Sequence, residues 1–494
     1  MNRTVPRALA FALIPVLLLL CGFSCDAPLS PGYRILKESR EIRFVPGQPP
    51  ALQIRARYSL LNSGTADLTF VDAIFPDEKS FGRKDLRVEV NGHAAAPESL
   101  PAEFQQEQPS ALRIPLDPPW TRKRTREISI EYVFSSPGDS GPRITLSESD
   151  FHLGSRGWLP ELQPPKHLLA PNPVRPKLTE YTVRVPADFL VLARGAAKGS
   201  NREGAEIAYR FELSAEDLAP FVVAGRYAAW PARGKPRSTV FWTAQPLTED
   251  AAPAAVQISD AWKTLEKDFG ALDKNITGPH IVESPGLSGH LPGEAGAEAA
   301  AFPGGAIVNP AAFALGTGSA QFLEIVSHAL AHNWFGDEMY PSPDAAVGMG
   351  EGLPEYATIV IEEARRGSDA RRRRIAEYLR RYDEARSDAT ETPLGVTTLS
   401  SPLAQRRIAQ AKAPLFFAAL EDACGAAPVR AGLAHLLAQL RGREVDYNDL
   451  RSALEGSTNR PLGAMFRQWL NNTGVPDDFR SRYQGAAKGD VAKK

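Results

Sequence analysis

The sequence predicts an α+β fold with more than one domain, in which an antiparallel β-sandwich-like N-terminal domain precedes a mainly helical domain. Two observations predict it. Apolar and polar residues alternate in many short segments up to Tyr227, and apolar residues recur at helical spacing from Ala252 onward. The stretch "WPARGKPRS" separates the two patterns, and 494 residues are enough for two or three domains.

Residues 1–25 are expected to be an export signal. Arg3 and Arg7 precede an apolar run, Ala8 to Leu20, that is shorter than the roughly 20 residues needed to span a bilayer. Cys25 follows this run and resembles the lipid-modified cysteine of bacterial lipoproteins, although the two residues at 22 and 23 depart from the usual pattern. We therefore expect export from a bacterial cell and a periplasmic or membrane-anchored lipoprotein, with plain secretion as the alternative.

Residues 26–235 are expected to form the β-rich domain. The segments "LQIRARYSLL", "REISIEYVF", "YTVRVP" and "IAYRFELS" alternate as half-buried strands do. Turn signals such as Asn91-Gly92 lie between them.

Residues 236–482 are expected to form the helical domain, and residues 483–494 a mobile tail. Asp446 is placed to cap one of its helices, because its side chain can accept hydrogen bonds from first-turn amides. Helical spacing predicts helices at 256–270, 319–335, 352–366, 369–387, 404–422, 428–441, 446–456 and 462–472.

Charge and cysteine content limit the function classes. The 57 basic and 58 acidic residues give a net charge of -1, so we expect no nucleic-acid partner. The stretch "RRRRIAEYLRRYDEAR" is interrupted by acidic residues, and we interpret it as a solvated helix face. Cys424 is the only cysteine outside the leader region, so the body of the protein has no intrachain disulfide.

A metal site is predicted by the stretch "SHALAHNWFGD". His328 and His332 are four residues apart, so on a helix both imidazoles lie on one face. Eighteen residues separate His332 from Glu351, which begins another predicted helix. Two histidines and one carboxylate leave a fourth position open, as in catalytic zinc sites. The alternative is a pair of ordinary core or surface histidines and a carboxylate that stabilises a helix start.

Two further residues are candidates near this site. Glu355, one turn after Glu351, is expected to orient a ligand histidine rather than bind metal, with simple solvation as its alternative. His290 lies in a glycine-rich stretch that we expect near the substrate cleft.

At these residues the sequence resembles the aminopeptidase N family of gluzincin zinc metallopeptidases, whose signature is H-E-x-x-H, eighteen residues, then E. The words "HNWFGD", "EGLPEY", "AEDLAPFVVAGRY" and "FRQWLNNTGVPDD" resemble that family as well. The resemblance implies that the helical domain is thermolysin-like and that one zinc per chain is bound by His328, His332 and Glu351.

Three departures from the family concern catalysis. Ala329 stands where the family has the glutamate that serves as general base. Losing such a base lowers the rate of hydrolysis by a factor of roughly 10² to 10⁴. Gln410 stands at the position of the oxyanion-stabilising tyrosine, and Ala413 replaces a following glycine. The G-x-M-E-N strand, whose glutamate binds the substrate amine, has no counterpart. Glu294 and Glu298 are the only acids in the corresponding region, and neither has the neighbours that the motif requires.

The sequence therefore predicts a zinc-binding homologue of aminopeptidase N that is catalytically inactive or impaired, with a peptide or protein as its ligand. One alternative is an active zinc hydrolase in which Glu294, Glu298 or a substrate carboxylate serves as the base. The other is a non-enzymatic module that holds a peptide or a partner protein in the old cleft.

Overall fold

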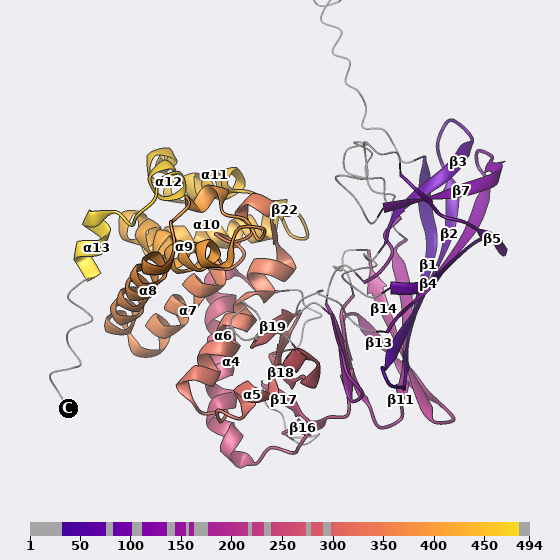
Figure 1. Ribbon diagram of the computed structural model, residues 1–494, viewed down its shortest axis with the longest axis horizontal. Coiled ribbons are helices and arrows are strands. Elements are labelled where there is room, and N and C mark those ends of the chain that lie inside the picture. The colour runs from indigo at the N-terminus through magenta and orange to yellow at the C-terminus, as the bar shows by residue number, and fades with distance from the viewer. Residues whose placement is uncertain are drawn as a thin grey trace, which may run out of the picture.

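The structure is a computed structural model that describes residues 32–75, 83–100, 111–135, 144–154, 158–162, 176–215, 220–231, 239–272, 278–289 and 298–483. The expected leader with Cys25, the candidates His290 and Glu294, and the chain after Tyr483 lie outside these residues. Among the helices in those ranges, none is long and apolar enough to cross a membrane. Figure 1 shows the β-rich N-terminal half on one side and the helices on the other.

The N-terminal domain is built from three sheets. The largest has the strand order β13-β14-β11-β1-β2-β8-β4-β5, and the smaller ones are β12-β15-β10-β9 and β3-β7-β6. The bounds are β1 Tyr33–Val45, β2 Ala51–Asn62, β3 Leu68–Ile74, β4 Arg83–Val90, β5 His93–Ala95, β6 Glu98–Ser99, β7 Ala111–Trp120, β8 Thr125–Phe134, β9 Ile144–Leu146, β10 Asp150–Leu153, β11 Leu178–Pro186, β12 Leu190–Ala193, β13 Ala196–Glu203, β14 Glu206–Ser214 and β15 Val222–Gly225.

The alternation of the sequence places one face of the large sheet in a core. In β2, Leu52, Ile54, Ala56, Tyr58 and Leu60 are buried, and the residues between them are more exposed. One pair differs from the antiparallel expectation: β1 runs parallel to β11, with Glu38 opposite Thr179. The segment between these two strands crosses over other strands before it returns, and period-two alternation does not encode strand direction.

The second domain begins with a five-stranded sheet that the sequence analysis did not predict. Its order is β16-β17-β18-β20-β19, with β19 at one edge. The strands are β16 Ala228–Trp230, β17 Val240–Thr243, β18 His280–Glu283, β19 Ala299–Phe302 and β20 Gly305–Val308. Each has at most four residues, too few for alternation to stand out from its surroundings.

The helices of this domain follow the predicted order. They are α4 Ala252–Phe269, α5 Pro310–Phe313, α6 Ala320–Ala331, α7 Gly352–Arg366, α8 Ser368–Asp388, α9 Leu403–Cys424, α10 Ala426–Gln439, α11 Tyr447–Thr458, α12 Gly463–Leu470 and α13 Asp477–Tyr483. Asp446 caps α11 as predicted, since its side chain accepts from the amides of Asn448 and Asp449. The helix expected at about 319–335 is divided: α6 stops at Ala331, and a π-helical turn over Asn333–Glu338, kinked at Phe335 and Gly336, follows it.

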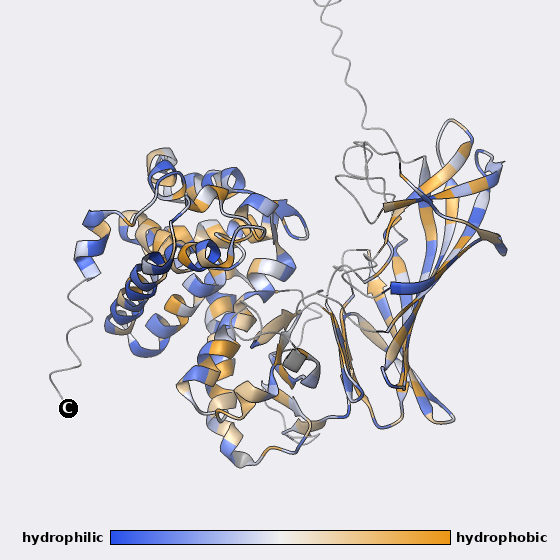
Figure 2. Cartoon of the chain, viewed as in Figure 1, coloured by the Kyte–Doolittle hydropathy of each residue, from blue (hydrophilic) through white to orange (hydrophobic). Residues whose placement is uncertain are grey.

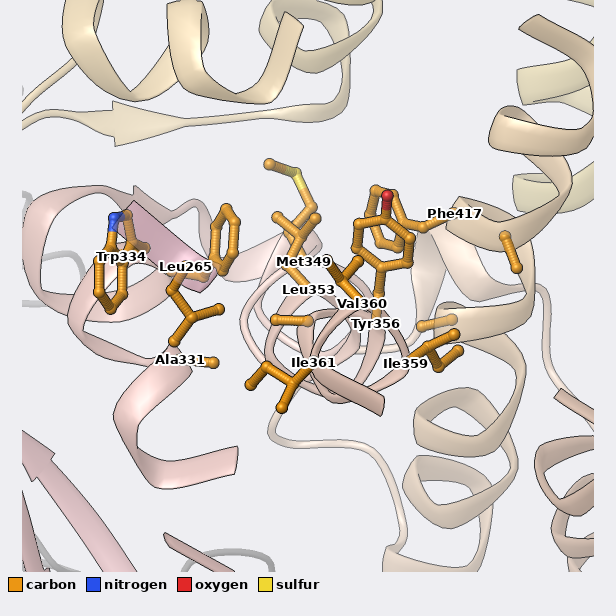
Figure 3. Packing of buried hydrophobic residues seen from close by; sticks show 14 of the residues in the cluster. Leu265, Ala331, Trp334, Met349, Leu353, Tyr356, Ile359, Val360, Ile361 and Phe417 are labelled. Atoms are coloured by element: carbon orange, nitrogen blue, oxygen red, sulfur yellow. The ribbon is translucent and has the colours of Figure 1, made fainter. Parts of the chain in front are cut away.

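Helix α7 lies in the centre of the helical domain. Leu353, Tyr356, Ile359, Val360 and Ile361 are all buried, and Figure 3 shows these residues pointing outward from α7 in several directions into surrounding apolar side chains. A helix that is apolar on most sides is a core helix. Burying each large aliphatic side chain stabilises the fold by about 1.5–3 kcal/mol, so the start of α7 is held firmly in place.

The arginine-rich helix α8 is less solvated than its sequence indicates. It is blue along almost its whole length in Figure 2, yet the side chain of Arg374 is only 10% exposed. Arg374 pairs with Glu324 of α6 and Glu377 of α8. The expectation of a solvated helix face holds for the exposed Arg372, Arg373 and Arg380, whereas Arg374 turns inward to its ion pair with Glu324 of α6.

The two domains meet through a small apolar cluster and a buried carboxylate. Phe221 and Val223 pack with Val282, Phe302 and Ile307 of the five-stranded sheet. Beside them Ser284 donates a hydrogen bond of 2.6 Å to Asp150 of β10, which is 1% exposed. A buried acceptor that is satisfied across the interface fixes the position of β10 against the second domain.

Candidate metal centre

The two histidines lie at the C-terminal end of α6. Ser319 begins the helix, since its hydroxyl accepts from the amide of Phe322 at 3.1 Å. Phe322, Val326 and Leu330 are fully buried, which directs the face carrying His328 away from the core. His332 follows the last helical residue and opens a wide turn over Asn333–Glu338, closed by a 3.0 Å bond from the amide of Asp337 to the His332 carbonyl.

Asn333 anchors this turn to the sheet. Its buried amide donates to the carbonyls of Gly305 at 3.1 Å and Leu330 at 3.0 Å, and its oxygen accepts from the amide of Gly304 at 2.7 Å. Two of these hydrogen bonds, to Gly304 and Gly305, join the end of α6 to the β19–β20 hairpin, and the third returns to α6 itself. The histidines are therefore fixed relative to the edge strand β19.

Glu351 completes the group from the start of α7. Its Oε2 lies 3.7 Å from Nε2 of His328 and 3.8 Å from Nε2 of His332, and the two Nε2 atoms are 3.1 Å apart. Ligands about 2.0–2.1 Å from a tetrahedral zinc ion lie roughly 3.3 Å from one another. Three donor atoms that all lie within 4.8 Å of one another fit one face of such a tetrahedron.

The charges of the centre also suit a divalent cation. Burial lowers the pKa of His328, but Glu355 and Glu351 outweigh it and raise that pKa to about 10. At His332 burial prevails and the pKa is lowered. Burial raises the pKa of the carboxyls of Glu351 and Glu355. His328 and other nearby groups outweigh burial, so the net pKa of Glu351 is lowered and that of Glu355 falls to about 2. A divalent cation in place of the His328 proton would balance these two carboxylates.

Glu355 lies behind His328. Its Oε1 is 3.5 Å from Nδ1 of His328, on the side of the ring opposite the Nε2 that faces Glu351. At this ion-pair distance, with no hydrogen bond to Nδ1, the carboxylate still favours a proton on Nδ1 and the lone pair on Nε2, which is the form that binds metal. This position suits the orienting role expected from the sequence.

A cleft of about 630 Å³ opens beside the centre. His332 and Glu351 line it together with His152 of β10 and the alanines of β19. The remaining lining residues are Gly154, Phe335, Gly336, Asp337, Tyr340, Pro341, Pro343, Ala346, Gly350, Thr398, Leu399, Ser400 and Glu444. The cleft is therefore walled by both domains, and its wall is mostly apolar.

None of the described positions that depart from the aminopeptidase N pattern is among the residues that line this cleft. Ala329 is 1% exposed and packs in the apolar core. Gln410 is half-buried on α9, one turn before Ala413, which touches the start of α7. Glu298 is exposed just before β19 and does not line the cleft, whose lining on β19 consists of Ala299, Ala300 and Ala301.

Sequence reasoning missed three parts of the site. His152 comes from the other domain, and only its residue type could have drawn attention to it. The loop Thr398–Ser400 has no pattern of its own. Tyr378, which donates to Glu355, stands in the arginine-rich stretch whose charges dominated its interpretation.

The comparisons with known proteins point to one family. The profile of the Peptidase family M1 domain matches residues 307–469, which include His328, His332 and Glu351. No curated protein sequence matches the chain. The M1 zinc metallopeptidase from Deinococcus radiodurans matches with a TM-score of 0.59 at 15% identity over 90% of this chain and 95% of that one.

Two structures of a glutamate-to-alanine mutant of that peptidase match as well. One has a TM-score of 0.59 at 16% identity and covers 90% of this chain and 96% of that one. The other, bound to a Tyr-Ser-Ala substrate, has a TM-score of 0.60 at 16% identity and covers 90% and 95%. Because nearly the whole length of each chain is covered, both domains here have the fold of M1 zinc metallopeptidases.

Proposed function

We propose that this chain is an aminopeptidase N-like homologue that holds one zinc ion at His328, His332 and Glu351, binds peptides in the adjoining cleft and hydrolyses them slowly or not at all. The observation that carries the proposal is the combination of a complete ligand set with a methyl group, Ala329, at the position of the general base.

The three ligands would supply a zinc centre with one open position facing the cleft. Bound there, zinc would polarise a peptide carbonyl and lower the pKa of a water molecule. Glu355 would hold His328 in its ligating tautomer. The chain therefore has the residues that would bind the zinc ion and the carboxylate that would orient one of them.

The edge strand β19 is suited to bind the peptide backbone. Among the described strands it pairs with β20 alone, so the backbone groups of its other edge are suited to pair with an extended peptide. Ala299, Ala300 and Ala301 line the cleft, and their small side chains let a peptide approach closely. The Deinococcus radiodurans glutamate-to-alanine mutant bound to Tyr-Ser-Ala is a peptide complex of the same fold, which supports a peptide as the ligand.

The weak step is proton transfer. A general base must come within hydrogen-bond reach of the attacking water, and the methyl group of Ala329 can accept no proton. Losing such a base costs about 10² to 10⁴ in rate, and Gln410, although its amide can donate, replaces the tyrosine hydroxyl that stabilises the oxyanion in the family. Slow or absent turnover follows from these two losses together.

A second candidate function is an active hydrolase with a relocated base. The cleft is lined by Asp337 and Glu444 as well as Glu351, so carboxylates other than the missing glutamate are present in it. Glu298, one of the acids considered from the sequence, is not among the lining residues. This candidate predicts turnover that disappears in Asp337→Asn or Glu444→Gln.

The first experiment is elemental analysis of the purified protein and of His332→Ala. One zinc per native chain, reduced to a small fraction in the mutant, is expected. The same preparations are then tested for binding and hydrolysis of short unblocked peptides such as Tyr-Ser-Ala. Binding without turnover supports the proposal; turnover above about 1 s⁻¹, a value within the ordinary range of enzymes, would favour the second candidate. A native chain without metal and without peptide binding contradicts both.

Export and lipid attachment remain part of the proposal. Arg3, Arg7 and the apolar run before Cys25 support a signal that delivers the chain to the periplasm, with Cys25 acylated. Metabolic labelling with a fatty acid tests it: the native protein should be labelled and Cys25→Ser should not.

A further inference from the structure

Helix α8 supports the metal centre through one hydroxyl group. Tyr378 is 2% exposed, and its hydroxyl donates a hydrogen bond to Oε2 of Glu355. The other oxygen of the same carboxylate, Oε1, is the one 3.5 Å from Nδ1 of His328. Glu355 therefore bridges Tyr378 on α8 and His328 on α6.

Tyr378 is itself held from two sides. Its hydroxyl lies 3.2 Å from Oγ1 of Thr358, one turn after Glu355 on α7. The guanidinium of Arg374 lies 5.0 Å from the centre of its ring, and Nη2 of Arg374 is 3.5 Å from the hydroxyl. Arg374 also pairs with Glu324, which lies four residues before His328 on α6. The three helices that build this part of the centre are thus connected by polar contacts around a single tyrosine.

The hydroxyl of Tyr378 restricts the orientation of the Glu355 carboxylate. A buried carboxylate can rotate about its terminal torsion, which has broad minima. A donor at Oε2 restricts this rotation and keeps Oε1 toward Nδ1 of His328. Groups that orient ligand histidines in this way contribute about 10- to 100-fold to metal affinity.

We propose that Tyr378 is a positioning residue of the metal centre, which acts through Glu355 to hold Nε2 of His328 toward the bound metal. The inference rests on the proposed zinc site and extends it. It also bears on whether that site is vestigial: the chain keeps a tyrosine on a separate helix in contact with the carboxylate that orients a ligand, although the residue at the general-base position is alanine.

The test is the zinc dissociation constant, measured by competition with a chelating dye. Tyr378→Phe should bind zinc about 10- to 100-fold more weakly than the native chain. Tyr382→Phe is the matched control, because Tyr382 lies one turn further on α8 and donates 2.6 Å to Glu391, outside the centre. It also loses one buried hydrogen bond, and its zinc affinity should stay within about threefold of native.

A double-mutant cycle separates positioning from general destabilisation. Tyr378→Phe should have no further effect in a Glu355→Ala background, because residues that act through one another are not additive. If Tyr378→Phe does not fold, the zinc affinity of Glu355→Gln is measured in its place. It should be about tenfold weaker than that of the native chain. Additive effects, or zinc affinity within threefold of native in a folded Tyr378→Phe or Glu355→Gln, would overturn the inference alone. Absence of zinc from the native chain would overturn the proposed site and the inference with it.

Discussion

Gly352 and Ala413 are in direct contact where α7 meets α9: a Cβ added to Gly352 would lie 2.4 Å from Cβ of Ala413. Gly352 directly follows the proposed ligand Glu351, so this contact sets how closely the ligand-bearing end of α7 approaches α9. Ala413 occupies a position at which the aminopeptidase N pattern has glycine. The methyl group at 413 therefore makes the glycine at 352 a steric requirement.

We expect Gly352→Ala to lower the free energy of unfolding by about 1–3 kcal/mol, as overpacking a close helix contact does. Because the first turn of α7 must shift, zinc affinity should fall as well. Urea unfolding and dye competition measure the two effects. Gly456→Ala is the control, since Gly456 lies within α11 with nothing within 4 Å of an added Cβ, and it should stabilise by up to about 1 kcal/mol.

Exchanging the residues at positions 352 and 413 tests whether steric crowding causes the loss of stability. Gly352→Ala combined with Ala413→Gly should recover most of the lost stability and zinc affinity, because the crowded pair is removed. Equal stability of Gly352→Ala and the native chain would contradict the contact.

The part of the centre that the sequence could predict is the part that lies on one helix or at one helix start. His328 on α6 and His332 directly after its last residue are neighbours because of a four-residue spacing, and Glu351 directly precedes α7 as its flanking residues indicate. By contrast, Tyr378 and His152 reach the site from a different helix and a different domain. Such contacts depend on how elements pack, and a local pattern carries no information about packing.

The fold shows the same division. β2 was predictable because burial of one face leaves a period-two trace, and α7 because an apolar run of helical length indicates a core helix. The three- and four-residue strands of the five-stranded sheet and the parallel pairing of β1 with β11 were not predictable, because neither leaves a trace in the sequence pattern. The early end of α6 reflects tertiary contacts of Asn333 with the sheet, which override the helical pattern after it.

The loop that carries Thr398–Ser400 to the cleft follows a buried carboxylate, Glu391. This carboxylate accepts from Nζ of Lys412 at 3.0 Å, the amide of Gly474 at 2.8 Å and the hydroxyl of Tyr382 at 2.6 Å. Burial raises the pKa of Glu391, but these donors outweigh it and the net pKa is lowered. A carboxyl with a lowered folded-state pKa stabilises the protein above its unfolded value of about 4.3, and this contribution is lost as the pH falls.

We therefore expect Glu391→Gln to cost about 1.5–3 kcal/mol at pH 7, the range for hydrogen bonds to a charged group. The difference from the native chain should shrink as the pH falls from 5 to 3. Urea unfolding across this range measures it. Glu384→Gln on α8 is the control, because Glu384 forms only an exposed pair with Arg380 and should change stability by less than about 0.5 kcal/mol. A cost for Glu391→Gln that stays constant with pH would rule out the ionised carboxylate as its source.

Restoring the missing base tests how far the catalytic defect extends. We expect Ala329→Glu to gain less than about tenfold in peptide hydrolysis, because the oxyanion position, Gln410, and the amine-binding glutamate are also changed. Ala329→Gln, of equal size and without charge, controls for the effect of a longer side chain at this buried position. A gain above 10²-fold for Ala329→Glu alone would show that a single residue accounts for the loss.

The charges of the cleft predict which peptides bind. Asp337 and Glu444 line it, and no lysine or arginine is among its lining residues in the described part of the chain. A like charge a few ångströms away costs roughly 1 kcal/mol or more near a protein surface, so Ala-Glu-Ala should bind at least about fivefold more weakly than Ala-Lys-Ala. Titration calorimetry at low and high salt measures this preference, which should diminish with screening. Glu444→Gln should reduce the preference while leaving the zinc content unchanged. Equal affinity for both peptides at low salt would mean that the ligand contacts the apolar wall of the cleft without approaching its carboxylates.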